Sequence, residues 1–339
     1  MHMKINLKII LTIFAVLTFL IDIHGQVGLN KLAQSTMNFQ LVSLSPKASA
    51  MGEAYYAVNK GAESIFYNPA GLANMGDNTF NVVVDYTQWI ADIDYLGGAA
   101  AWNLKNYGTL GISLMSVNYG TIYGTSLDPN AGSALGYIDN GMLSNVSAYS
   151  FGISYAKAIS EQFAIGGNIR IAGQNLGVNN FNNGASVKND ASKLVFDAGV
   201  IYYTDFKKFR FGMAIRNFSS NIIREAIYEQ LPLTFTVGTA IDLLDFINPN
   251  HSQDDAFTLA VDFLHSNNYS ERFNLGAEYK FLGMVALRAG YQTNRDLASW
   301  SAGIGLNKTI DGNEIEVNYS YSKMDIFKNV SRLSVGFSL

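Results

Sequence analysis

The chain of 339 residues has no cysteine, only five prolines and few charged side chains. Without cysteine it can form neither disulfides nor thiolate metal sites, and lipid attachment at a cleavage-site cysteine is excluded. Charged residues make up 15% of the chain, below the ~25% usual for globular proteins. The formal net charge of -4 provides no basic footprint, so the composition gives no support to nucleic-acid binding.

Long apolar runs are also missing after residue 25, although aromatic residues reach 13% of the chain. A bilayer offers no water to unpaired backbone groups, so only helices and closed barrels can span it. Because no stretch after residue 25 is long enough for a membrane helix, the composition favours a closed barrel over an ordinary soluble enzyme.

The N-terminus has the layout of a signal peptide. Lys4 and Lys8 form a basic region, residues 9–20 are almost entirely apolar, and a small residue precedes Gln26. A membrane anchor helix is the alternative, but spanning takes ~20 apolar residues, and this stretch ends before that length is reached. We therefore predict a signal peptide over residues 1–25 and an exported mature protein.

From about residue 79 to residue 339, apolar and polar residues alternate in segments of about ten. In 313–323, for example, Ile315 and Val317 alternate with Glu316 and similar polar residues. One face of each segment would meet lipid and the other a lumen, as in a transmembrane barrel. The predicted fold is thus all-β, a 14-stranded antiparallel transmembrane β-barrel, with strands near 79–89, 92–104, 107–119, 146–159, 162–176, 193–204, 207–218, 231–242, 255–265, 271–282, 284–293, 298–308, 313–323 and 330–339.

The gaps between these segments alternate in length. Outer-membrane barrels have short periplasmic turns and longer external loops. Long gaps follow the third, fifth and seventh strands, at 120–145, 177–192 and 219–230. The gap at 243–254 is an exception, because it is long although it lies on the side of the short turns. The gap after the first strand is unexpectedly short for an external loop. The first strand is therefore predicted to run outward.

The last predicted strand, 330–339, reaches the final residue of the sequence. Leu333, Val335, Phe337 and Leu339 alternate with polar residues, and an apolar final residue is a usual handle for barrel insertion. The alternative is an edge strand of a soluble exported β-sandwich, which would normally carry protective charges on its exposed face. No charge lies on the apolar face of this segment.

Residues 26–78 do not share the alternation. A barrel of fourteen strands encloses more space than inward side chains can fill, which leaves a channel or room for a plug. We predict three regions, namely a signal peptide (1–25), an N-terminal plug or hatch (26–78) and a barrel (79–339).

Within this segment, KASAMGEAYYAV (47–58) is followed by FYNPAGLA (66–73). This region resembles the N-terminal part of the FadL/TodX superfamily of outer-membrane barrels. It looks most like the PorV/PorQ-like branch of Bacteroidetes-type bacteria. The resemblance implies a hatch that meets the barrel at the candidate gate residues Asn68, Pro69, Ala70 and Gly71. Turn chemistry alone also accounts for them, because Pro69 fixes φ, Asn68 is extended and Gly71 permits a turn.

Charged residues on the polar phase of the strands form a candidate lumen network. A ring of one sign would suggest an ion-selective pore, whereas mixed signs favour hydrogen bonds and ion pairs between wall and plug. The three tryptophans, Trp89, Trp102 and Trp300, are predicted at the interfacial girdles. The candidate network comprises Asp197, Arg210, Arg216, Asp262, Glu278, Lys280, Arg288 and Glu316.

No catalytic, metal-binding or cofactor-binding residues are predicted. The four histidines lie in the signal peptide or near predicted loops and strand ends, with no metal or Ser-His-Asp spacing. Gly97, Gly98, Gly303 and Gly305 fall inside strands, where they ease curvature or make room for the plug, so nucleotide binding is not indicated. The sequence predicts no enzyme.

Two functions follow from the resemblance, both in the outer membrane and in contact with its lipid. The first is a type IX secretion accessory that binds exported proteins, their C-terminal signal domains or the translocon. The second is FadL-like uptake of hydrophobic small molecules such as long-chain fatty acids. The loops rich in Gly, Asn and Ser favour the first, whereas a cavity lined by Phe181, Leu127, Leu135 and Leu143 would favour the second.

Overall fold

The computed structural model describes residues 35–339, except for short gaps in loops and at strand ends. The predicted signal peptide and residues 26–34 therefore lie outside the described residues. The internal gaps are 130–134, 144–145, 181–185, 205, 207, 225–226, 249, 253 and 296–297.

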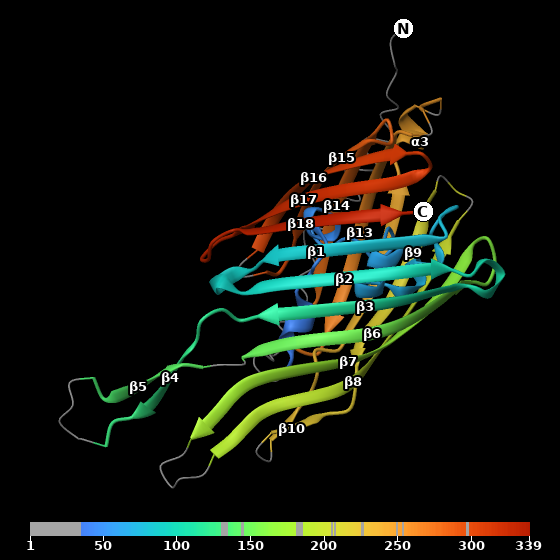
Figure 1. Ribbon diagram of the computed structural model, residues 1–339. Coiled ribbons are helices and arrows are strands. Elements are labelled where there is room, and N and C mark those ends of the chain that lie inside the picture. Colours follow the sequence, from blue (N-terminus) through green and yellow to red (C-terminus); the bar gives the residue numbers. More distant parts are fainter. Residues whose placement is uncertain are drawn as a thin grey trace.

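Fourteen antiparallel strands close into a barrel (Figure 1), which confirms the predicted fold and strand number. The barrel closes where the first strand pairs with the last, over Asn81 to Gln88 and Ser338 to Ser331. The strands are β1 (Phe80–Gln88), β2 (Asp94–Asn103), β3 (Thr109–Asn118), β6 (Ser147–Ala158), β7 (Phe163–Asn180), β8 (Ser186–Tyr203), β9 (Arg210–Phe218), β12 (Thr234–Asp242), β13 (Ala256–Ser266), β14 (Arg272–Phe281), β15 (Val285–Gln292), β16 (Ala298–Ile310), β17 (Asn313–Met324) and β18 (Val330–Ser338).

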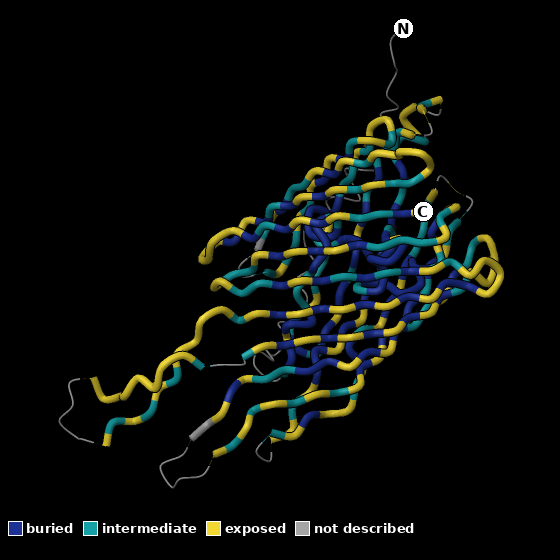
Figure 2. The backbone as a smooth tube through the Cα atoms, viewed as in Figure 1, coloured by how far each residue is buried: buried dark blue, intermediate teal, exposed yellow. Residues whose placement is uncertain are grey.

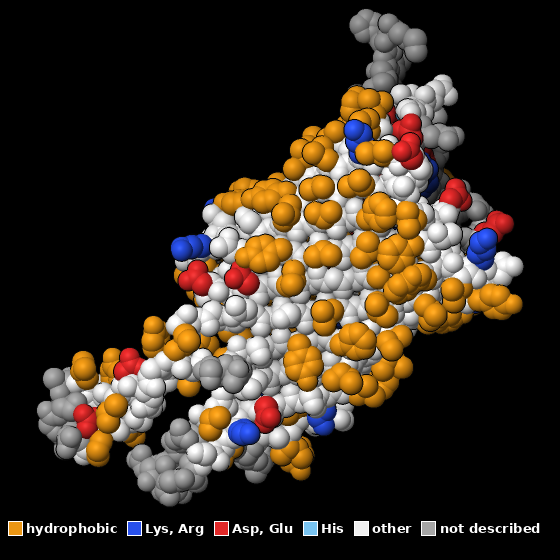
Figure 3. All heavy atoms as spheres, in the orientation of Figure 1, with side chains coloured by type: hydrophobic (Ala, Val, Ile, Leu, Met, Phe, Trp, Pro, Cys, Tyr) orange, Lys and Arg blue, Asp and Glu red, His pale blue; other side chains and the backbone are white. Residues whose placement is uncertain are grey.

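The alternation in sequence becomes the difference between the two faces of the wall. On β7, Ile169 is 53% exposed on the outer face, whereas its neighbour Asn168 is 3% exposed on the inner face. Figure 2 shows the same alternation of exposed and buried residues along the other strands. In Figure 3, hydrophobic side chains cover the middle of the visible outer face, and charged ones gather toward its ends.

Three of the predicted long loops contain more strand than their sequences indicate. β7 and β8 continue through most of the predicted loop 177–192. The loop after β3 holds a hairpin of β4 (Tyr123–Leu127) and β5 (Tyr137–Met142), which projects from the barrel (Figure 1). The loop after β9 holds the hairpin of β10 (Ile222–Arg224) and β11 (Ile227–Glu229). Neither face of these extensions has to contact lipid, so their sequences do not alternate between apolar and polar residues.

The two ends of the barrel differ in their connections. At one end, here called the long-loop end, lie the connections after β1, β3, β7 and β9. At the other, the short-turn end, lie tight connections such as those after β14 and β16. The exceptional gap between β12 and β13 belongs to the short-turn end and contains a short helix, α3 (Leu244–Ile247).

Residues 35–78 run through the interior and are here called the inner segment. The segment begins at the long-loop end, where the Thr36 N–H donates to the Gln230 carbonyl at 2.9 Å, and Thr79 follows it at the short-turn end. None of the helices in the described chain has the length and apolar character needed to cross a membrane. Those in the inner segment are η1 (Asn38–Leu41), α2 (Pro46–Ala50), η2 (Ala62–Phe66) and η3 (Pro69–Ala73).

Glycines in the wall allow the inner segment to approach the strands closely. A Cβ atom on Gly290 would lie 1.9 Å from the Gly52 nitrogen, so only glycine fits there. Gly97 and Gly303 likewise face side chains of the inner segment, because a Cβ on them would lie 2.5 Å from Leu44 and 2.6 Å from Ala50 respectively. These two glycines make room for the inner segment, as the sequence predicts.

Candidate functional site

The Asn68 turn is fastened to the barrel wall. Asn68 caps η3 by accepting a hydrogen bond from the Ala70 nitrogen at 3.2 Å. Its amide donates to the carbonyls of Tyr56 and Val200, each at 3.0 Å, and so joins the inner segment to β8. Asn68 is fully buried and extended, and Pro69 starts the 3-10 helix, as its fixed φ allows.

Gly71 serves a different purpose from the one its sequence suggests. Its φ is not in the left-handed region, so it does not supply a special turn conformation. A Cβ atom there would lie 1.9 Å from Asn59 Oδ1. Gly71 is needed because the chain packs against Asn59, and Ala70 beside it is fully buried.

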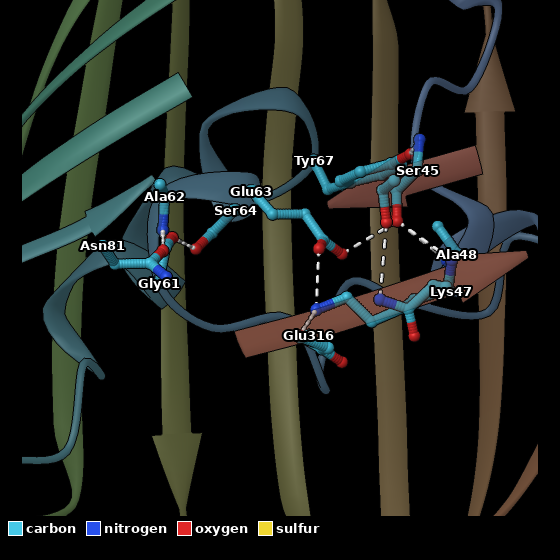
Figure 4. Close-up of polar contacts among 12 residues, drawn as sticks. Ser45, Lys47, Ala48, Gly61, Ala62, Glu63, Ser64, Tyr67, Asn81 and Glu316 are labelled. Carbon is cyan, nitrogen blue, oxygen red and sulfur yellow. Dashed lines mark hydrogen bonds and ion pairs between the residues drawn. The ribbon is translucent and has the colours of Figure 1, made fainter. Parts of the chain in front are cut away.

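Lys47 links the inner segment to the wall (Figure 4). Its Nζ lies 2.8 Å from Glu63 Oε2 and 2.9 Å from Glu316 Oε2 on β17. Ser45, which caps α2, also donates to Glu63 Oε1 at 2.9 Å. Lys47 therefore holds two carboxylates at once, one from the inner segment and one from the wall.

A second polar group lies within the wall itself, around Arg288. Arg288 Nε lies 2.6 Å from Glu278 Oε2, and Nη1 donates to Asn318 Oδ1 at 2.8 Å. Its Nη2 lies 4.0 Å from Glu316 Oε1, so this group adjoins the Lys47 contacts. The guanidinium crosses over Gly305, where a Cβ would lie 2.7 Å from Nη1.

A third group surrounds Arg170 and Asp197 on neighbouring strands. Arg170 Nε lies 2.9 Å from Asp197 Oδ2, and Arg170 also donates to the Gln40 side chain. Asn217, with a left-handed φ of 64° beside an irregularity in the β8–β9 pairing, donates its N–H to Asp197 Oδ1 at 2.7 Å. Both charged residues are almost fully buried.

The wall also holds the backbone of the inner segment at residues 55–57. Asp262 Oδ2 accepts the N–H groups of Tyr55 and Tyr56 at 2.7 and 3.0 Å. Arg210 Nε donates to the Ala57 carbonyl at 2.9 Å. On the neighbouring part of β9, Arg216 donates to the Tyr56 hydroxyl at 3.0 Å.

Six of the eight candidate network residues thus contact the inner segment or one another, and a seventh, Asp197, is bound to the wall residues Arg170, Asn168 and Asn217. The eighth, Lys280, lines a cavity and has no carboxylate within 4.0 Å among the residues described. Sequence reasoning missed Lys47, Glu63 and Arg170 as members. Arg170 lies on the polar phase of its strand, which is a usable signal, whereas the inner segment has no periodicity that would single out Lys47 or Glu63.

The interior near the long-loop end is apolar. Along β3 the apolar side chains change from the outer to the inner face. Leu114 faces outward, but Met115 and Val117 face inward and are buried, while Ser116 is exposed. Sequence reasoning missed this reversal, which marks the apolar part of the lumen. The cluster there comprises Met37, Phe39, Leu44, Tyr95, Met115, Val117, Ala148, Ala172, Val195, Ile222 and Leu231.

A cavity of about 370 Å³ adjoins this cluster and is here called the mouth pocket. Its polar edge includes Tyr119, whose hydroxyl accepts from Gln174 Nε2 at 2.8 Å. The pocket is lined by Ser35, Thr36, Met37, Asn38, Phe39, Val42, Trp89, Tyr95, Tyr119 and Gln174.

The tryptophans divide between the two faces. Trp102 and Trp300 are 40% and 46% exposed, as the girdle interpretation predicts. For Trp89 that interpretation is wrong, because Trp89 packs against the apolar cluster and lines the mouth pocket. It follows the end of β1, where the chain turns over the barrel rim, so strand parity no longer determines its direction.

Among the described residues, Leu127, Leu135 and Leu143 do not appear in the lining of the mouth pocket. Leu127 and Leu135 are 73% and 72% exposed on the projecting hairpin. Leu143 packs near Gly124, and Phe181 lies outside the described residues. The apolar space lies deeper, among strand residues and the inner segment.

A larger cavity of about 500 Å³ lies at the short-turn end and is here called the basal cavity. It is bordered by the inner segment and by the ends of β14 to β18, and reaches the turn at Gly283. Its charged lining residues are Lys47, Lys60, Glu63, Arg210, Glu278, Lys280, Arg288, Glu314 and Glu316.

Comparison with known proteins identifies the fold. No family model and no curated protein sequence matches the chain. The toluene transporter TbuX of Ralstonia pickettii is similar in structure, with a TM-score of 0.60 and 13% identity over 88% of this chain and 99% of TbuX. The toluene transporter TodX of Pseudomonas putida has a TM-score of 0.57 and 12% identity over 87% of this chain and 96% of TodX. A FadL homologue of Pseudomonas aeruginosa has a TM-score of 0.52 and 12% identity over 88% of this chain and 97% of the homologue. The chain therefore shares the barrel fold of these FadL/TodX-type proteins.

Proposed function

We propose that the protein is an outer-membrane barrel that takes up hydrophobic small molecules through the mouth pocket. The observation that carries this proposal is the reversal of polarity inside the barrel, where Met115 and Val117 face the lumen. A concave apolar site with a few polar groups is what such ligands require. The polar groups of the lining are those of Ser35, Thr36, Asn38, Tyr119 and Gln174. The structurally similar TbuX and TodX are toluene transporters, which supports a hydrophobic cargo.

Trp89 offers a direct test of ligand binding. In a Trp102→Phe/Trp300→Phe background it is the remaining one of the three tryptophans. A brominated fatty acid bound in the mouth pocket should quench its fluorescence saturably in the detergent-solubilised protein. Phe39→Asp, which places a charge in the lining, should abolish this quenching, whereas Phe327→Asp on an exposed loop should not. Quenching that never saturates, or that survives Phe39→Asp, would contradict the proposal.

We further propose that the inner segment, with residues 26–34, acts as the hatch and that Asn68, Pro69, Ala70 and Gly71 form its junction with the wall. The hydrogen bonds from Asn68 to Tyr56 and Val200 support a fixed junction around which the rest would move. Export after cleavage before Gln26 belongs to the same proposal. N-terminal sequencing of protein from isolated outer membranes tests the cleavage, and resistance to carbonate extraction tests the insertion.

The projecting hairpin favours a second candidate, the type IX accessory role that the PorV/PorQ-like resemblance implies. β4 and β5 pair only with each other among the described strands, and Tyr123 and Met142 are 62% and 65% exposed. Exposed apolar residues on a projecting element commonly mark protein contacts. Secreted proteins with C-terminal signal domains, or the translocon, would be the partners.

Affinity purification from native outer membranes distinguishes the two candidates. For the accessory role, the tagged protein should recover a translocon barrel or secreted proteins, and replacing residues 121–143 by a short Gly-Ser linker should remove them. Recovery of the barrel alone, loaded with apolar molecules, would support uptake and contradict the accessory role.

A further inference from the structure

The basal cavity contains more positive charge than its carboxylates neutralise. Two internal groups account for most of the lining charges: Lys47 binds Glu63 and Glu316, and Arg288 binds Glu278. These groups occupy three of the four lining carboxylates. The fourth, Glu314, accepts a hydrogen bond from the Asn307 amide.

Three cationic side chains remain around the same space. Within the described part of the chain, neither Lys60 nor Lys280 has a carboxylate within 4.0 Å. Arg210 donates to the carbonyls of Ala57 and Lys208 and likewise forms no ion pair there. They come from three separate elements, the inner segment, β14 and β9, so the cavity gathers them from distant parts of the sequence.

Because Lys60 and Lys280 line the same cavity, their like charges repel each other. An anion between the two ammonium groups would remove this repulsion. Charge-assisted hydrogen bonds from lysine and arginine to an oxyanion are shorter and stronger than neutral ones.

We propose that the basal cavity is a binding site for a phosphate or carboxylate group, held by Lys60, Lys280 and Arg210. The cavity volume of about 500 Å³ is within the ~300–1,000 Å³ of small-molecule sites. This site is separate from the mouth pocket and does not depend on the uptake of hydrophobic molecules. Its opening at the short-turn end makes it accessible from the side opposite to the long loops.

Lysine methyl signals provide the test. The full mature protein in detergent is reductively methylated with 13C-formaldehyde, and the signals of Lys60 and Lys280 are assigned from Lys60→Arg and Lys280→Arg. Inorganic phosphate and succinate are titrated separately against chloride at constant ionic strength. Saturable shifts of both signals are expected with at least one of the two anions, and no such shift for Lys308, which is exposed and is paired with outward-facing Ile315. The anion that acts identifies phosphate or carboxylate as the ligand group.

Matched variants separate a built site from general attraction. Lys280→Gln should weaken binding about tenfold or more, because a charge-assisted hydrogen bond is lost. Lys308→Gln should leave it unchanged, and Lys280→Arg should retain it. Heat-modifiable gel mobility confirms folding of each variant. Shifts of equal size at Lys308, the absence of saturation with both anions, or unchanged affinity in Lys280→Gln would overturn the proposal.

Discussion

Arg170 and Asp197 form an ion pair that is almost fully withdrawn from solvent, with 7% and 6% exposure. Removing charges from water is costly, and this pair offsets the cost through extra hydrogen bonds from Asn168 and Asn217 to Asp197. Arg170 also reaches Gln40, so the pair connects the wall to the start of the inner segment. At the scale of single residues, this part of the interior depends on Arg170 and Asp197 keeping each other as partners.

Asp197→Leu should therefore destabilise the protein by about 3–5 kcal/mol, because Arg170 would remain charged, buried and unpaired. Urea unfolding in the presence of lipid vesicles measures this loss. Adding Arg170→Met should recover a large part of it. Asp190→Leu, on the exposed part of the same strand, is the control and should stay within about 0.5 kcal/mol. Equal losses for Asp197→Leu and Asp190→Leu would contradict the role of the pair.

His251 gives a pH-dependent prediction outside the barrel strands. Its Nε2 lies 3.0 Å from Asp245 Oδ1, and this contact, followed by that with the Ser252 carbonyl, raises the pKa of His251 above its usual ~6.5. The stabilisation is fully present below the unfolded pKa and is lost as pH rises through the higher folded pKa. NMR titration of the ring should show a pKa that falls in Asp245→Asn. A His251 pKa unaffected by that substitution would refute the prediction.

At the scale of elements, the wall and the inner segment fit because glycines stand where two backbones meet. Gly166 illustrates this: a Cβ there would lie 2.4 Å from the Pro69 carbonyl oxygen. Gly290 is tighter still against Gly52. The strands are therefore shaped both by the pairing of the sheet and by the chain that they enclose.

Gly290→Ala should destabilise the protein by about 1–3 kcal/mol, because the added methyl group meets backbone that cannot rotate away. Gly98→Ala is the matched control, since a Cβ there would lie 3.7 Å from the Val83 oxygen, an ordinary contact. Urea midpoints of the two variants test this difference. If Gly290→Ala is as stable as Gly98→Ala, the inner segment is not packed as described.

The strands of the barrel wall could be predicted closely from sequence, because one face must be apolar toward lipid and the other polar toward the lumen. The predicted segment 92–104 contains β2 (Asp94–Asn103), for example. The extensions of β7 and β8 and the projecting hairpin were missed because no face there needs to be apolar. The contacts of Lys47 could not be predicted either, since Glu316 lies 269 positions away and the inner segment, which contains Glu63, has no periodicity.

At the scale of the whole molecule, the barrel closes only when its two most distant strands meet. The Thr79 N–H donates to the Leu339 carbonyl at 2.6 Å, and the Leu339 N–H donates to the Phe80 carbonyl at 2.9 Å. Closure removes the free strand edges that would otherwise pair with other chains. The cohesion of the barrel therefore depends on its final strand.

Removing residues 330–339 should abolish the compact, heat-modifiable form, because β1 and β17 would both be left with a free edge. Semi-native gel electrophoresis after refolding into detergent measures this. The chain with residues 121–143 replaced by a linker is the control and should keep the compact form, since the β4–β5 hairpin lies outside the barrel sheet. A compact form without β18 would mean that thirteen strands close by themselves.

The path of the inner segment separates the two ends of the described chain. Ser35 lies at the long-loop end, bridged to Gln230, whereas Leu339 lies at the short-turn end beside Phe80. In an outer membrane, with long loops facing outward, an epitope inserted directly before Ser35 would be readable by antibodies on intact cells. One appended after Leu339 would be hidden until the cells are opened. An even number of strands alone would leave both ends of the chain on the same side of the membrane. The inner segment crosses once more, through the lumen, and so places Ser35 and Leu339 on opposite sides.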